Sequence, residues 1–113
     1  MTEKLSERSC VPCEGGVDPL EGNAVAAMVE KIDDGWEVVE GHHLHREFDL
    51  EDFQEALDFT NRVGEIAEEE DHHPVIHLTW GEVKLDIWTH AIDGLSENDF
   101  ILAAKVDELY DDL

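Results

Sequence analysis

Histidine is the side chain in this sequence best suited to proton transfer near neutral pH, because its ordinary pKa is about 6.5. The chain has seven histidines, and four of them lie between positions 72 and 90. His72 and His73 separate an expected helix from an expected strand, and His90 closes the next strand. A tight turn at Gly81 would make these strands antiparallel neighbours, with the start of one beside the end of the other. We therefore expect His72, His73 and His90 to meet at one end of a sheet.

The residues around the histidine pair favour acid–base chemistry. A helix C-terminus and the acidic run from Glu68 to Asp71 both stabilise an imidazolium. An imidazole that carries a proton near pH 7 serves as a general acid, and a neighbouring imidazole serves as the base. Asp71 is placed to orient an imidazole, as in a carboxylate–histidine pair. The alternative is a set of solvated surface histidines, which the spacing alone does not exclude.

A metal site is a second interpretation of the histidines, and the spacing argues against it. His73 and His77 are four positions apart, which suits zinc on a helix, but Pro74 between them is incompatible with a helix. In a strand the two side chains lie about 13 Å apart at ~3.3 Å per residue, too far to share an ion. Three more histidines, within residues 42–45, fall in an expected hairpin and are interpreted as solvated. We therefore predict no metal site.

Apolar periodicity and turn residues predict the elements that position the histidines. Asp49 is a candidate N-cap of the second helix, and Ser96 with Asp99 has the spacing of a capping box at the start of the last. The expected helices cover 20–32, 50–71 and 97–110, and the expected strands cover 36–39, 44–48, 75–80 and 82–90. This order, αββαββα, defines an α+β protein with a four-stranded antiparallel sheet and helices packed on one face.

The first part of the chain differs from the rest. Residues 1–18 contain proline and glycine and show no periodicity, so we predict a flexible N-terminal arm, followed by a single domain over residues 19–113. Cys10 and Cys13 form a C-x-x-C pair in this arm. Because neither a βαβ unit nor two further ligands accompany the pair, we interpret it as two thiols rather than a redox or zinc site.

Charge is the strongest compositional signal. Thirty acidic residues outnumber seven lysines and arginines, and the net charge is -23. Nucleic acids and anionic membranes are bound by clustered cations, so we expect neither as a partner. The acids are spread along the chain and the apolar fraction is 42%, which favours a folded protein adapted to concentrated salt, as in a halophile. The sequence lacks an apolar run of ~20 residues and a secretory signal, so we expect a cytoplasmic location.

Several fixed spacings occur together in this chain. They comprise Glu68-x-x-x-His72-His73-Pro74, Trp80 after five residues, His90 after nine more and Asp99 after eight more, with Thr89-His90, Gly94-Leu95-Ser96 and Gly35-Trp36 as shorter runs. The pattern resembles the signature of pterin-4a-carbinolamine dehydratases. The resemblance extends from about residue 5 to residue 110.

The resemblance implies both a fold and an activity. The fold is αββαββα, and the activity is removal of water from 4a-hydroxytetrahydropterin to give a quinonoid dihydropterin in pterin cofactor recycling. The main catalytic histidines would be His72 and His90, with His73 as the third active-site histidine, acting as acid and base. The reaction would need no cofactor and no metal. Members of the family are dimers or tetramers, so a homo-oligomer is expected.

Other residues receive supporting roles. Trp36 and Trp88 offer flat surfaces for a pterin, although core packing explains either equally well. Asp99 belongs to the pattern, but its place in the capping box favours a structural role. Glu68 and Pro74 are interpreted as supporting residues in the same way.

Two other functions stay open at this point. Some animal members of the family stabilise dimers of a homeodomain transcription factor, so a non-catalytic pterin-binding or protein-dimerisation module is one alternative. A dehydratase of a molybdopterin-related pathway is another, since it would use the same histidines.

Overall fold

The computed structural model describes residues 4–10 and 18–113, and it confirms the expected order of long helices and strands. Two short 3-10 helices, η1 and η2, are additional. The elements are η1 Leu5–Glu7, α1 Asn23–Val29, β1 Glu37–Val39, β2 His43–Asp49, α2 Phe53–Glu70, β3 Val75–Thr79, β4 Glu82–Ile87, η2 His90–Ile92 and α3 Glu97–Asp111. None of the helices in the described part of the chain has the length and apolar character needed to cross a membrane.

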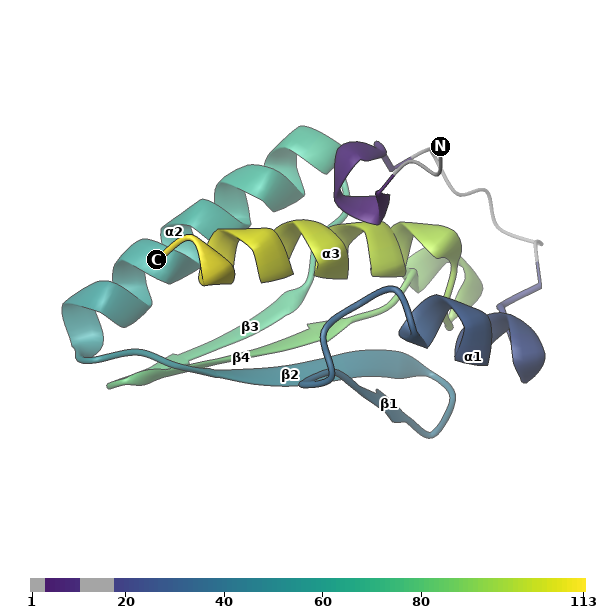
Figure 1. Cartoon of the computed structure of the whole chain (residues 1–113), viewed down its shortest axis with the longest axis horizontal. Coiled ribbons are helices and arrows are strands. Elements are labelled where there is room, and N and C mark those ends of the chain that lie inside the picture. The colour runs from purple at the N-terminus through teal and green to yellow at the C-terminus, as the bar shows by residue number, and fades with distance from the viewer. Residues whose placement is uncertain (1–3, 11–17) are drawn as a thin grey trace.

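The four strands form one antiparallel sheet in the order β1-β2-β4-β3. The central strand β4 pairs with β2, where Leu44 lies opposite Ile87, and with β3, where Val75 lies opposite Asp86. Helices α2 and α3 lie side by side over one face of this sheet (Figure 1). The α+β architecture is therefore the one that the sequence predicts.

The core lies between the sheet and the two long helices. Alternation along β4 turns Val83, Leu85 and Ile87 toward the helices, and all three side chains are fully buried. Phe59 and Val63 face them from α2. Helix α3 is buried along most of its length because α2, α1 and η1 all contact it. This burial fixes α3, and with it Asp99, relative to the strand ends.

Different local interactions determine where helix α2 begins and where it ends. The sequence predicts Asp49 as the N-cap, and that prediction is wrong, because β2 continues through Asp49, which pairs with Glu82. Asp52 caps the helix instead, by accepting a hydrogen bond from the Glu55 amide at 2.8 Å. At the other end, Asp71 adopts the left-handed conformation (φ 52°) and terminates the helix. The chain then turns toward β3, as expected from Pro74.

Part of the predicted arm packs on the domain. Leu5 in η1 is buried in the core, and the Lys105 ammonium of α3 donates a hydrogen bond to the Ser6 carbonyl at 2.9 Å. A single apolar residue in a polar run gives no periodic signal, so the sequence alone does not reveal this contact. Residues 11–17, and with them Cys13, lie outside the described residues.

Strand β2 carries a charged residue, Arg46, on its core-facing side. The guanidinium lies 4.5 Å from the Phe48 ring centroid and donates to Asp107 Oδ1 at 2.5 Å. Asp107 also accepts from Trp36 Nε1 at 2.7 Å and from the Asp33 amide at 3.0 Å. Burial raises the pKa of the Asp107 carboxyl, and these donors oppose that shift. Trp36 is only 5% exposed, so the structure corrects its assignment as a substrate-binding ring and places it in the core.

Candidate active site

A cleft of about 600 Å³ opens between the C-terminal end of α2 and the segment that joins β4 to α3. It brings together most of the residues that the sequence singles out, namely His72, His73, His90, Asp71 and Trp88. Their convergence follows from the antiparallel pairing of β3 and β4, which places the residues before β3 beside those after β4. The cleft therefore combines three imidazoles with one large aromatic ring.

The His72 side chain is held by a buried carboxylate. Its Nε2 lies 2.6 Å from Asp99 Oδ1, and the two side chains are 11% and 0% exposed. The sequence assigns the orienting role to Asp71, and the structure gives the contact to Asp99. Asp71 is exposed, and its position at the end of α2 serves to terminate the helix. The two residues of the His72–Asp99 pair are 27 positions apart, so only the packing of α3 brings them together.

Asp99 has two further donors. Its Oδ2 accepts from the Ser96 amide at 2.8 Å, which is the N-cap contact that the sequence predicts. The same oxygen accepts from the Thr89 hydroxyl at 2.9 Å. Thr89 in turn lies 2.7 Å from Ser96 Oγ. One carboxylate thus caps α3, anchors the segment after β4 and orients His72. Of these three roles, the sequence predicts only the capping of α3, from the spacing of Ser96 and Asp99.

His73 occupies a more open position. Its Nε2 lies 2.5 Å from Glu68 Oε2, but the two side chains are 55% and 79% exposed. An ion pair so accessible to water contributes little to stability. Glu68 therefore orients His73 at the mouth of the cleft, whereas Asp99 holds His72 in its interior.

Trp88 and His90 form a parallel stack. Their ring centroids are 4.5 Å apart and their planes differ by 6°. The sequence predicts a strand through His90, but β4 ends at Ile87, because Thr89 and Gly94 exchange backbone hydrogen bonds at 2.8 and 3.4 Å around the η2 turn. Trp88 and His90 still point the same way because one residue separates them. Trp88 is half-buried and lines the cleft, while His90 is exposed.

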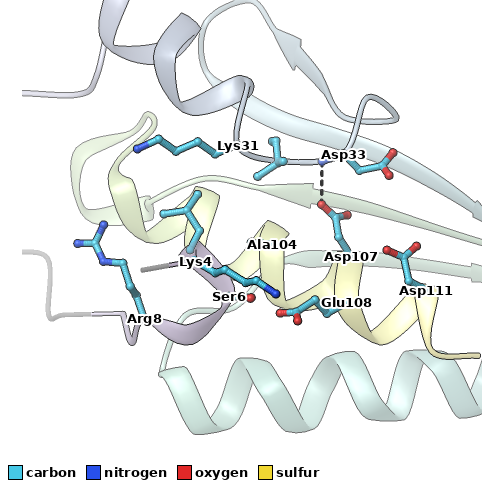
Figure 2. Close-up of a pocket in the computed structure, with 11 residues that line it drawn as sticks. Lys4, Ser6, Arg8, Lys31, Asp33, Ala104, Asp107, Glu108 and Asp111 are labelled. Atoms are coloured by element: carbon cyan, nitrogen blue, oxygen red, sulfur yellow. Dashed lines mark hydrogen bonds between the residues drawn. The ribbon is translucent and has the colours of Figure 1, made fainter. Parts of the chain in front are cut away.

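A larger cleft, about 670 Å³, lies between η1, the segment after α1 and helix α3 (Figure 2). Lysine, arginine and carboxylate side chains supply its charges, and no imidazole is found among the described residues that line it. Asp107 there accepts the Asp33 amide hydrogen bond drawn in Figure 2. Lysine, arginine and ordinary carboxylates hold fixed charges near pH 7. We therefore place the acid–base site in the smaller cleft with the histidines. No group of side chains suited to a metal ion occurs within the described residues.

Cys10 lines the histidine cleft, which the sequence does not predict. Its amide donates to Glu70 Oε1 at 2.7 Å, and its thiol donates to the Asn98 carbonyl at 3.5 Å. Burial and the nearby Glu70 carboxylate raise the pKa of the thiol from 9.0 to about 12. Cys10 is therefore protonated and weakly nucleophilic at neutral pH.

This raised pKa predicts slow alkylation of Cys10. A Cys13→Ser variant leaves Cys10 as the only thiol, and its reaction with iodoacetamide at pH 8 should be roughly 100-fold slower in the folded protein than in urea. The folded-state rate should still be rising between pH 9 and pH 11. Mass spectrometry of timed samples measures both rates. A rate that levels off near pH 10 would show that the thiol ionises near its ordinary pKa of 9.0.

Comparison with known proteins shows the family of the chain. The model of the pterin 4 alpha carbinolamine dehydratase family matches residues 18–109. A relative from Rubrobacter xylanophilus, named for this dehydratase, is 54% identical over 106 residues, which cover 94% of this chain and 98% of the relative. Pterin-4-alpha-carbinolamine dehydratase 2 of Arabidopsis thaliana, a mitochondrial protein, is 44% identical over 110 residues, which cover 93% of this chain and 58% of that protein.

The fold agrees as well. A transcriptional coactivator/pterin dehydratase from Brucella melitensis has a crystal structure that matches with a TM-score of 0.76 and 28% identity, covering 82% of this chain and 99% of that one. Fold and sequence together define the class as hydro-lyases with an α+β fold. The chain belongs to the pterin-4a-carbinolamine dehydratase family.

Proposed function

We propose that this protein removes water from a 4a-hydroxytetrahydropterin and gives the quinonoid dihydropterin in pterin cofactor recycling. The observation that carries the proposal is the buried His72–Asp99 pair, with 2.6 Å between Nε2 and Oδ1, in a cleft that also holds His73 and His90. An imidazole fixed in this way has a defined tautomer and a defined direction for proton transfer.

The proposed reaction is an elimination without change of redox state. The C4a–O bond breaks, the hydroxyl leaves as water after gaining a proton, and N5 loses its proton as the C4a–N5 double bond forms. The chemistry needs one acid and one base, and positioned imidazoles supply both. A metal or a redox cofactor has no step to perform in this scheme.

The hydrogen bond to Asp99 supports a separate role for each nitrogen atom of His72. An ionised carboxylate only accepts hydrogen bonds, so the contact with Asp99 places the proton of neutral His72 on Nε2. Nδ1 is then the atom that accepts or donates a proton in the cleft. We propose His72 as the leading acid–base group, with His90 as its partner across the cleft and His73 in a binding and assisting role.

Trp88 is the proposed surface for the flat pterin ring. It is half-buried, lines the cleft and is already stacked on His90. The part of the indole that lines the cleft, together with the His90 ring stacked on it, forms a rigid wall that orients a planar ligand at little entropic cost. The homo-oligomer, the cytoplasmic location and the adaptation to salt stay predictions from the sequence.

The test is the dehydration rate of a freshly generated 4a-hydroxytetrahydropterin in molar KCl. We expect wild type to accelerate the reaction over buffer, and His90→Ala to lower that acceleration by about 10²-fold, the lower range for lost acid–base catalysis. His77→Ala is the matched control, because His77 is 59% exposed and lies outside the cleft. Folded wild type that gives no acceleration would refute the proposal for that pterin.

A further inference from the structure

The turn between β1 and β2 lies beside Trp88, the large aromatic ring that lines the histidine cleft. His42 and His43 stand at this turn, with ring centroids 5.3 and 5.9 Å from that of Trp88. Their two Nδ1 atoms are 3.0 Å apart, so one ring donates a hydrogen bond to the other. The pair is only partly exposed, at 33% for His42 and 23% for His43. Three imidazole rings therefore lie against Trp88, those of His42 and His43 from the β1–β2 turn and that of His90.

His42 also bonds to the segment that carries His90. Its Nε2 lies 2.7 Å from Oδ1 of Asp93, the residue that ends the η2 turn His90–Ile92. Asp93 has the left-handed conformation (φ 49°) and donates its amide hydrogen to the His90 carbonyl at 3.2 Å. The His42–Asp93 bond thus joins the β1–β2 turn directly to the short loop that holds His90.

The His90 ring has few other restraints. It is exposed, and the ring contact that it makes within the described part of the chain is the stack on Trp88. The direction of its ring then depends on two things, the plane of Trp88 and the conformation of the η2 turn. His42 contacts Trp88 and bonds to Asp93 at the end of that turn, and His43 supports the same indole.

We propose that His42 and His43 are positioning residues, which set the direction of the His90 ring through Trp88 and Asp93. Neither of them lines the cleft, so they act through other side chains and not on the pterin. The proposal rests on the dehydratase function proposed above. A small displacement of a catalytic group lowers the rate of proton transfer without a matching loss of substrate binding.

A double-mutant cycle tests the proposal. Rates are measured for wild type, His42→Ala, His90→Ala and the double variant. We expect His42→Ala to lower kcat roughly tenfold with little change in KM, and to cause no further loss when His90 is absent. A merely structural role would lower the rate by the same factor in both backgrounds, and that result would overturn the proposal.

Two further variants sharpen the cycle. His42→Gln keeps a donor for Asp93 and should restore most of the lost rate. If glutamine restores nothing, the bond to Asp93 does not position His90. His77→Ala is again the control, because it also removes an imidazole that faces a carboxylate, at a longer distance of 3.7 Å from Asp86 and away from the cleft.

A readout independent of turnover separates this proposal from the dehydratase function. The Trp88 ring current should shift the His90 ring protons upfield in NMR spectra of wild type, and His42→Ala should reduce that shift. The His90→Ala spectrum identifies the resonances. If wild type does not accelerate dehydration, the proposed dehydratase function is wrong. The NMR spectra still test whether His42 positions the His90 ring. Resonances that stay in place in His42→Ala would overturn the positioning proposal.

Discussion

Dehydration by a His72→Gln variant is expected to be about 10²–10⁴ times slower than by wild type, the range for a lost acid–base group. Glutamine can still donate a hydrogen bond to Asp99 from a position near that of His72 Nε2, which is 2.6 Å from Oδ1. It cannot gain or release a proton as the imidazole does at Nδ1. The loss should therefore appear in kcat, while circular dichroism and the unfolding midpoint stay close to those of wild type.

An Asp99→Asn variant separates the two tasks of that carboxylate. The asparagine side chain can still accept the Ser96 amide hydrogen bond and so preserve the cap of α3. Its amide group can instead donate to His72, which favours the wrong tautomer, with the proton on Nδ1. We expect a loss of activity of roughly 10²-fold or more in a protein that still folds. Wild-type rates in either variant would remove His72 from the leading role.

The second large effect concerns stability. Replacing Asp107 by alanine is expected to lower the free energy of unfolding by about 3–5 kcal/mol, because it leaves the buried Arg46 charge with the longer, 3.5 Å contact to the exposed Asp33 carboxylate. Arg46 is 8% exposed and donates to Asp107 at 2.5 Å. The Trp36 indole and the Asp33 amide lose their acceptor in the same change. Urea titration in molar KCl measures the difference.

The matched control for this change is Asp111→Ala. Asp111 is exposed at the end of the same helix, and its loss alters the net charge by the same amount. It should change the unfolding free energy by no more than about 0.5 kcal/mol. The double variant Arg46→Met/Asp107→Leu removes both charges and should be more stable than Asp107→Ala. Equal stability of Asp107→Ala and Asp111→Ala would show that the Arg46–Asp107 pair is dispensable.

The sequence by itself determined the element order, the sheet and the family. Apolar repeats span a few residues, so they report helices and strands directly, and the capping spacing of Ser96 and Asp99 located the start of α3. The alternation through β4 and the turn at Gly81 were enough to predict that His72 and His90 approach one another. These signals are local, or they follow from one pair of adjacent strands.

The tertiary structure decided which side chains meet across distant elements. Asp99 rather than Asp71 contacts His72 because α3 packs beside the end of α2, and no local pattern encodes that packing. Trp36 enters the core because the Asp107 carboxylate, which also pairs with Arg46, gives its indole a buried acceptor 71 positions away in sequence. The contact of His42 with Trp88 has the same origin. Such pairs depend on the relative placement of whole elements, which is set by the shape of the shared core.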